Sequence, residues 1–169
     1  GEYESATRPI TIFDLLTHSA GFTYSEFQQG AYRDAYVATL GGDIDSMISN
    51  DDWINGLASL PLASQPGSVF NYGRSTDLLG LLIAKIEAKT LYEVMQEKIF
   101  TPLGMSDTFF DVPTDKKHRC APNFGFDNNG QLVQLNSVPL NMAMTDRPKD
   151  LAYQSGGQGL WSTMDDYLQ

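Results

Sequence analysis

The strongest constraint on the fold is an apolar helix that the sequence predicts from Ser75 onward. Its apolar residues are Leu78, Leu79, Leu81, Leu82, Ile83 and Ile86. They cover more of the helix than the single stripe of a surface helix, so we expect it to be buried on several sides. Other elements must then pack around it. A chain of 169 residues, 41% of them hydrophobic, suits one domain or a piece of a larger one and can bury a real core.

Two further helices are predicted by signals at their ends. Thr11 followed three residues later by Asp14 is a short-acid version of the capping box. Thr90 followed by Glu93 is a full capping box, and the helix that it starts is expected to stop at Gly104. Gly21 occupies the place where the first of these two helices is expected to end.

The rest of the chain adds short helices and one pair of strands. We expect a helix before Gly41-Gly42, one from Asp43, one from near Asp51 with Trp53 inward, and one capped by Ser162. The stretch FGFDNNGQLVQL predicts two short strands around the turn at 127–130. The predicted fold class is therefore mainly α with a small β-hairpin.

Composition excludes several classes of partner. The formal net charge is −10, and the 11 Lys and Arg residues are scattered, so we expect no nucleic acid partner. No apolar run reaches the length of a membrane span, and we expect a soluble protein. Cys120 is the only cysteine, which rules out an internal disulfide and leaves the compartment unknown; we expect its thiol to be inert.

The usual catalytic signatures are missing from these 169 residues. No serine has a lysine three residues later, and there is no GxSxG elbow and no HExxH pair. GGQG at 156–159 lacks the GK[ST] ending of a phosphate loop, so neither a cofactor nor a metal is predicted. His18 would need a nucleophile and a carboxylate to act as a base, and a structural role at a helix end is the favoured interpretation.

Tyr72 raises a sharper question. It stands between the Pro66-Gly67 turn and the predicted start of the apolar helix. A tyrosine in that place either packs against its neighbours or points into a site, and spacing alone does not decide between the two.

Four blocks of sequence, taken together, indicate a family resemblance more strongly than any one of them does alone. In chain order they are TIFDLLTHSAGF, PGSVFNYGRSTDLLGLLIAKI, IFTPLGMSDTFF and GGQGLWSTMDDY. They resemble the serine beta-lactamase-related family, which comprises class C beta-lactamases, D-Ala-D-Ala peptidases and esterases of that fold. The resemblance runs from about residue 8 to the last residue. The YGRSTDLLG pattern, with Asp77 before the leucines, resembles the esterase branch more than true beta-lactamases.

The resemblance implies a helical domain paired with an antiparallel sheet, with the active site in the groove between them. In that family a serine of an S-x-x-K element is acylated, a Y-x-N tyrosine points into the groove, and a K-T-G or H-x-G strand follows. Tyr72 falls on that tyrosine, which makes it the candidate catalytic residue. The S-x-x-K element and the last strand do not occur in the sequence. We therefore expect residues 1–169 to be an internal segment, chiefly the helical domain of an α+β fold, and to be inactive alone.

A phenol can act as a base only if positive charge helps it. A free phenol has a pKa near 10, so a base at pH 7 needs a fall of roughly three units, or about 4 kcal/mol. In the family, the S-x-x-K lysine is the natural source of that charge. Arg74 stands where the Y-x-N asparagine is expected, and arginine offers only donors. As a substrate-binding residue Arg74 suits esters or acidic groups; a solvent-facing Arg74 is the alternative. By analogy, Tyr24 and Gly157 in the 156–159 loop are expected to border the groove.

Two functions follow as hypotheses. The first is a serine hydrolase that works through an acyl-enzyme, most simply a carboxylesterase, with a D-amino-acid peptidase or a beta-lactamase as alternatives. The second is a non-catalytic relative that binds a peptide or cell-wall fragment in the same groove. The expected partners are a small-molecule ester or amide substrate and the remainder of the same polypeptide.

Overall fold

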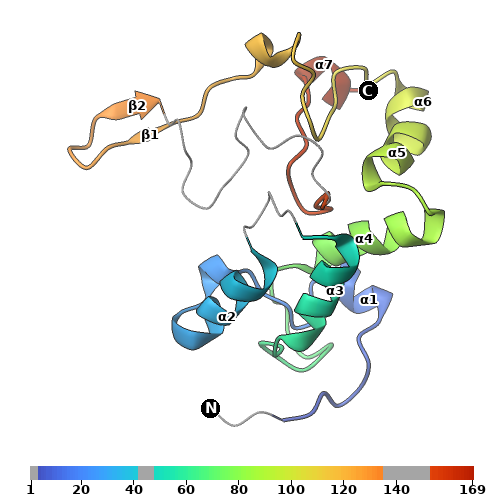
Figure 1. Cartoon of the computed structure of the whole chain (residues 1–169), viewed down its shortest axis with the longest axis vertical. Coiled ribbons are helices and arrows are strands. Elements are labelled where there is room, and N and C mark those ends of the chain that lie inside the picture. Colours follow the sequence, from blue (N-terminus) through green and yellow to red (C-terminus); the bar gives the residue numbers. More distant parts are fainter. Residues whose placement is uncertain (1–3, 42–47, 135–152) are drawn as a thin grey trace.

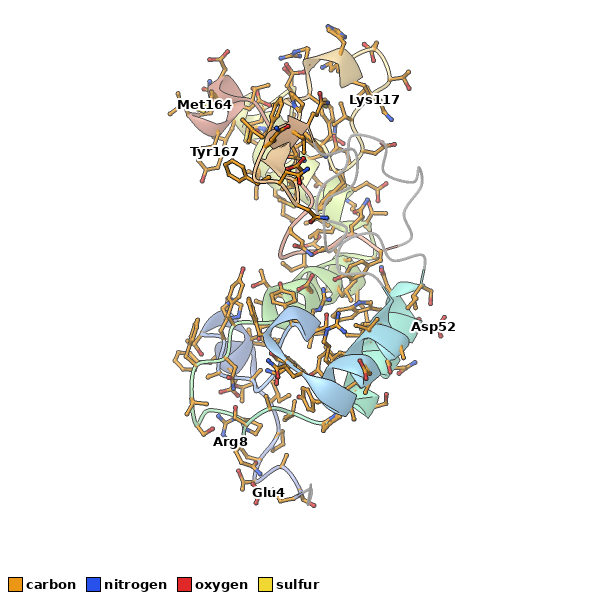
Figure 2. The ribbon with its side chains drawn as sticks, turned by 90° about the vertical axis from the view of Figure 1, so that its left-hand side faces the viewer. Glu4, Arg8, Asp52, Lys117, Met164 and Tyr167 are labelled. Atoms are coloured by element: carbon orange, nitrogen blue, oxygen red, sulfur yellow. The ribbon has the colours of Figure 1, made fainter. Side chains whose placement is uncertain are left out.

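The computed structural model describes residues 4–41, 48–134 and 153–169 (Figure 1). These residues are mainly helical and carry one two-stranded antiparallel sheet, which confirms the predicted fold class. The elements fall into two groups. Figure 2 shows Glu4 and Arg8 in one of them and Lys117, Met164 and Tyr167 at the far end of the other.

The first group is built from four helices and holds the main hydrophobic core. They are α1 (Ile12–Leu16), α2 (Gly30–Leu40), α3 (Asn50–Ser59) and α4 (Ser75–Glu87), with a 3-10 turn at Ser25–Phe27 before α2. The core comprises Leu15, Ala20, Phe22, Tyr36, Leu40, Trp53, Leu57, Leu60, Leu81 and Tyr153. Trp53 is inward as predicted, and its ring stacks on Tyr153 at 5.1 Å and 17°. Tyr153 thus brings a late segment of the chain into a core made by the first half.

Helix α4 is less enclosed than its sequence predicts. Its first two turns are buried through Ser75, Asp77, Gly80 and Leu81, but Ile83 and Ile86 are exposed. The prediction of burial on several sides is therefore wrong for the last turns, because the elements that pack on α4 in the described part of the chain cover mainly its N-terminal half.

The second group follows α4 along the chain. It contains α5 (Leu91–Met95), a π-helical turn at Gln96–Phe100, α6 (Thr101–Leu103), a 3-10 turn at Lys117–Arg119 and α7 (Met164–Tyr167). The Phe109 and Trp161 backbones exchange two hydrogen bonds, 2.8 and 2.7 Å, which fasten the last segment to the loop after α6. Buried Asp166 adds to this contact by accepting from the Asp107 amide at 2.7 Å and the Thr108 hydroxyl at 2.9 Å.

The hairpin stands away from both groups (Figure 1). Strands β1 (Phe124–Phe126) and β2 (Leu132–Gln134) are antiparallel, with Gly125 opposite Val133. The Asp127 carboxylate accepts the amides of Asn129 and Gln131 and so closes the turn that the sequence predicted.

The predicted helix ends are mostly confirmed. Both capping boxes form, at Thr11 with Asp14 and at Thr90 with Glu93, and Gly104 ends α6 with a left-handed φ of 70°. The helix predicted from Asp43 begins outside the described residues.

Two helix-end predictions are wrong. Helix α1 ends at Leu16, well before Gly21, because His18 itself adopts the left-handed conformation with φ 52°. The last helix is capped by Thr163, whose side chain accepts the Asp166 amide, and Ser162 lies one residue too early for that bond.

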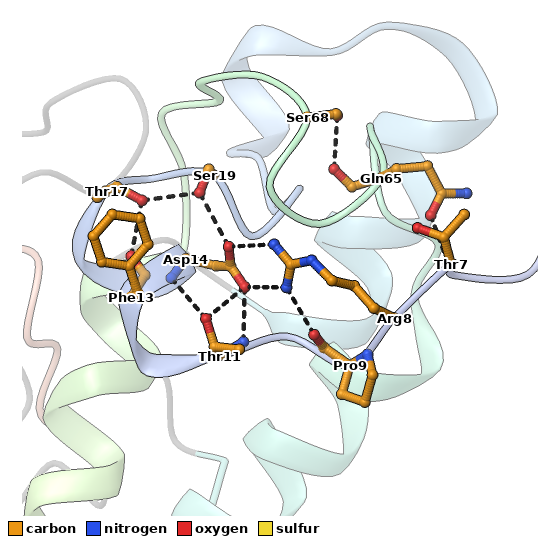
Figure 3. Close-up of polar contacts among 10 residues, drawn as sticks. All are labelled: Thr7, Arg8, Pro9, Thr11, Phe13, Asp14, Thr17, Ser19, Gln65 and Ser68. Atoms are coloured by element: carbon orange, nitrogen blue, oxygen red, sulfur yellow. Dashed lines mark hydrogen bonds and ion pairs between the residues drawn. The ribbon is translucent and has the colours of Figure 1, made fainter.

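An ion pair fixes the entry of the chain into α1 (Figure 3). Arg8 donates from both of its terminal nitrogens to the two carboxylate oxygens of Asp14, each at 2.7 Å. Asp14 also accepts the backbone amide and the hydroxyl of Thr11, both at 2.8 Å. The Arg8 and Thr11 hydrogen bonds hold the pKa of Asp14 well below its usual range, so this buried carboxylate is ionised in the native protein.

Candidate functional site

The loop before α4 is forced close to the segment after α1. A Cβ on Gly73 would lie 2.4 Å from the Thr23 Cα, so only glycine allows the two backbones to approach this closely. The Asn71 amide also donates to the His18 carbonyl at 2.7 Å. These contacts bring Tyr72, which lies between Asn71 and Gly73, next to residues from the first quarter of the chain.

Tyr72 lies on the surface within a group of rings. Its side chain is 51% exposed, and its ring centroid is 5.0 Å from that of His18, 5.5 Å from Tyr24 and 6.2 Å from Phe27. Tyr72 is therefore not enclosed in the leucine-rich interior, and the packing interpretation holds only for its contacts with these surface rings. A catalytic role for Tyr72 stays a prediction.

His18 supports the Tyr72 ring from one side. Its Nε2 is 3.3 Å from the Thr76 hydroxyl, and its Nδ1 is buried and has no hydrogen-bond partner among the residues that the structure describes. Together with the left-handed backbone just after α1, this position agrees with the structural interpretation of His18 at a helix end.

Asp77 accepts three hydrogen bonds from two segments that are distant in the sequence. It is fully buried in the first turn of α4, where the positive end of the helix dipole favours a carboxylate. The Tyr24 hydroxyl donates to its Oδ2 at 3.0 Å, while the Tyr153 hydroxyl at 2.7 Å and the Ser155 hydroxyl donate to its Oδ1. The carboxylate therefore ties the loop after α1, helix α4 and the late 153–157 segment together.

The two phenols bound to Asp77 are held in the protonated state. Burial, the negative charge of Asp77 and the hydrogen bonds to it raise the pKa of both Tyr24 and Tyr153 above the ordinary value. Tyr24 is thus a hydrogen-bond donor to Asp77 at neutral pH and is unsuited to act as a base.

Arg74 lies inside the same cluster. Its side chain is 2% exposed, and its guanidinium carbon is 4.7 Å from the centroid of the Tyr24 ring, within cation–π range. Its positive charge opposes the effect of Asp77 on the pKa of both Tyr24 and Tyr153. The solvent-facing alternative for Arg74 is therefore wrong. A role of Arg74 in substrate binding stays a prediction.

Gly157 completes the cluster. A Cβ on this residue would lie 3.0 Å from the Tyr24 hydroxyl and 3.1 Å from Asp77 Oδ2, and its amide donates to the Ser155 hydroxyl oxygen at 3.1 Å. The three predicted substrate-binding residues, Tyr24, Arg74 and Gly157, thus meet around Asp77.

The sequence prediction missed Asp77, Tyr153 and Ser155 as members of this cluster. The single available signal was an acidic residue at the start of an otherwise apolar helix.

A separate cavity lies in the second group of elements. It measures about 430 Å³, and its lining includes Phe109, Trp161 and Cys120 with the cations Lys116 and Arg119. Both cations pair with the same carboxylate, that of Asp107. Within 4–41, 48–134 and 153–169 there is no group of three His, Cys, Asp or Glu residues placed to hold a metal ion, and no helix is long and apolar enough to cross a membrane.

The chain matches the protein family described as Beta-lactamase over residues 2–169. It is 35% identical to an uncharacterized protein of Mycobacterium tuberculosis over 97% of this chain and 38% of that protein. It is 29% identical to Esterase EstB of Burkholderia gladioli over 95% of this chain and 43% of the esterase.

Solved structures agree with the sequence match. EstCE1, described as a hydrolase with promiscuous acyltransferase activity, superposes with a TM-score of 0.76 at 25% identity, over 95% of this chain and 44% of that chain. The chain therefore spans less than half the length of each of these relatives.

Proposed function

Because the chain belongs to the beta-lactamase family, we propose that its full-length protein is a serine hydrolase that forms an acyl-serine intermediate and acts as a carboxylesterase. The family includes esterases and acyltransferases. In this proposal the nucleophilic serine, its lysine and the last strand come from parts of the protein outside these 169 residues, which form chiefly the helical domain. The segment alone is then inactive.

Tyr72 is the proposed proton carrier. The serine oxygen attacks the ester carbonyl, and Tyr72, in the phenolate form that the charge of the S-x-x-K lysine would stabilise, takes the serine proton. The same proton passes to the departing alkoxide as the carbonyl re-forms. Water then attacks the acyl-serine; Tyr72 takes a proton from that water and returns it to the serine as the acid leaves. Each half-reaction leaves Tyr72 in its starting state.

The observation that carries the proposal is the contrast between two neighbouring tyrosines. The Tyr24 hydroxyl is committed to Asp77 and is kept protonated, whereas the half-exposed Tyr72 stands outside the Asp77 cluster with its ring against His18 and Tyr24. A surface phenol with a fixed ring suits proton transfer to a bound substrate. Tyr24 and Gly157 are proposed to border the substrate, and the burial of Arg74 supports a role through Tyr24.

The test is burst kinetics of the full-length protein on a chromogenic short-chain ester. Loss of a general acid–base group costs about 10²- to 10⁴-fold in rate, so Tyr72→Phe should lose at least about 100-fold in kcat/KM. Tyr167→Phe in α7, also exposed, is the matched control and should keep wild-type activity. Activity of Tyr72→Phe within a few-fold of wild type would refute the proton role.

Acyl transfer is a second candidate because EstCE1 is described as combining it with hydrolysis. It needs no other residues, since an alcohol simply replaces water in the second half-reaction. Adding an alcohol acceptor and measuring the new ester separates the two activities. A panel with one ester, one D-amino-acid amide and one beta-lactam separates the peptidase and beta-lactamase alternatives. A full-length sequence without an S-x-x-K element would favour the non-catalytic binding alternative.

A further inference from the structure

Tyr72 and two exposed phenylalanines belong to a series of neighbouring rings that includes His18; the three are here called the aromatic rim (Phe27, Phe70 and Tyr72). Phe27 is 62% exposed and Phe70 is 69% exposed. The Phe27 ring lies 6.2 Å from Tyr72, and Phe70 is linked to Tyr72 through His18, at 5.7 and 5.0 Å between ring centroids. Large aromatic side chains gathered on a surface mark a binding site more often than single exposed ones do.

The charged groups of the cluster do not reach this surface. Arg74 and Asp77 are buried, and the Asp77 carboxylate is satisfied by three hydroxyl groups. A substrate group that lies against the rim therefore meets ring faces and edges, with neither of these charges open to it. Apolar groups are favoured in such surroundings, and a carboxylate would lose hydration there without pairing with the buried Arg74.

The part of the substrate that lies against the aromatic rim follows from the proposed mechanism. Tyr72 hands its proton to the departing alkoxide, so the leaving oxygen must come within hydrogen-bond reach of the Tyr72 hydroxyl. Substituents on that oxygen then lie over the rings that contact Tyr72. We propose that the aromatic rim binds the alcohol part of the ester, and that the substrates are esters of uncharged alkyl or aryl alcohols. This inference rests on the proposed function.

Acetate esters of increasing alcohol length test it on the full-length protein, with acid release followed in a pH-stat. Each methylene buried against the rim should raise kcat/KM by up to about fourfold, so the values should climb from ethyl through butyl to hexyl acetate. The acetate ester of 4-hydroxybutanoate replaces the terminal methyl of butyl acetate by a carboxylate and should be at least about tenfold poorer than butyl acetate.

Variants show whether the rim is responsible. Phe27→Ala and Phe70→Ala should each lower the hexyl-to-ethyl ratio of kcat/KM about fivefold or more, and Phe27→Leu should restore part of it. Phe126→Ala is the matched control, because Phe126 is 75% exposed and lies on β1, in the hairpin that stands apart. It should leave the ratio unchanged. Urea midpoints of every variant are measured alongside.

Three results would overturn the proposal. If kcat/KM is measurable but does not change with alcohol length, the proposed role of the rim is refuted while the esterase function stands. A fall in urea midpoint for Phe27→Ala and Phe70→Ala, with an unchanged hexyl-to-ethyl ratio, would mean that the rest of the polypeptide covers the rim. Failure to hydrolyse any ester by the folded protein would refute the proposed function and the rim with it.

Discussion

Removing one oxygen atom from the core tests the Asp77 cluster. Tyr153 is fully buried, its ring stacks on Trp53, and its hydroxyl donates to the Asp77 carboxylate at 2.7 Å. Tyr153→Phe keeps the ring and loses only this bond. Hydrogen bonds to charged groups contribute about 1.5–3 kcal/mol, so we expect the free energy of unfolding to fall by about 2 kcal/mol. Asp77 keeps Tyr24 and Ser155 as donors, which argues against a larger loss.

The assay is urea denaturation of the full-length protein, with Tyr92→Phe as the matched control. The Tyr92 hydroxyl is half-buried and donates to a neutral acceptor, the Thr108 carbonyl, over a longer 3.3 Å. Its removal should cost less than about 1 kcal/mol. The reasoning fails if Tyr153→Phe is no more destabilising than Tyr92→Phe, since a buried carboxylate would then gain nothing from its phenol donor.

Two further predictions concern stability. The folded-state pKa of Asp14 lies below its unfolded value, so its contribution to the free energy of unfolding is present at neutral pH and is lost as the pH falls through about 4 and below. In urea titrations from pH 7 to 3, the free energy of unfolding should therefore fall less steeply for Asp14→Asn than for the wild type. Gly156→Ala would place a Cβ 2.3 Å from the Thr76 carbonyl oxygen and should lower the free energy of unfolding by about 1–3 kcal/mol, measured by urea titration at pH 7. Gly56→Ala is the control, because its Cβ would have its nearest contact at 3.1 Å, and it should cost clearly less. Equal losses in the two variants would contradict the packing argument.

Local signals in the sequence were sufficient for most of the secondary structure. The capping boxes at Thr11 and Thr90 and the turn at 127–130 depend on residues three or four positions apart, and all of them form. The error at Ser162 has the same local origin, because Ser and Thr both cap helices and only the spacing to Asp166 separates these two neighbours.

The candidate site was accessible to sequence reasoning only in part. Tyr72, Tyr24 and Gly157 were proposed from the family resemblance, and the structure brings them within one small region. The role of Asp77 as the common acceptor could not be predicted, because its donors lie 53, 76 and 78 positions away. The burial of Arg74 could not be predicted from the sequence either, because a position at the start of a helix does not indicate which other elements cover it.

The hydrogen bonds of Asp77 join residues that are far apart in the sequence, and this separation has a consequence for folding during biosynthesis. Helix α4 leaves the ribosome well before Tyr153 and Ser155 exist, and contacts between such distant residues form slowly and late in folding. Until residue 155 has emerged, the carboxylate lacks two of its three donors and is better solvated than enclosed. In nascent chains arrested just before residue 155, α4 should therefore be packed loosely. The surface around Tyr72 should reach its native structure only when the 153–157 segment docks against Asp77.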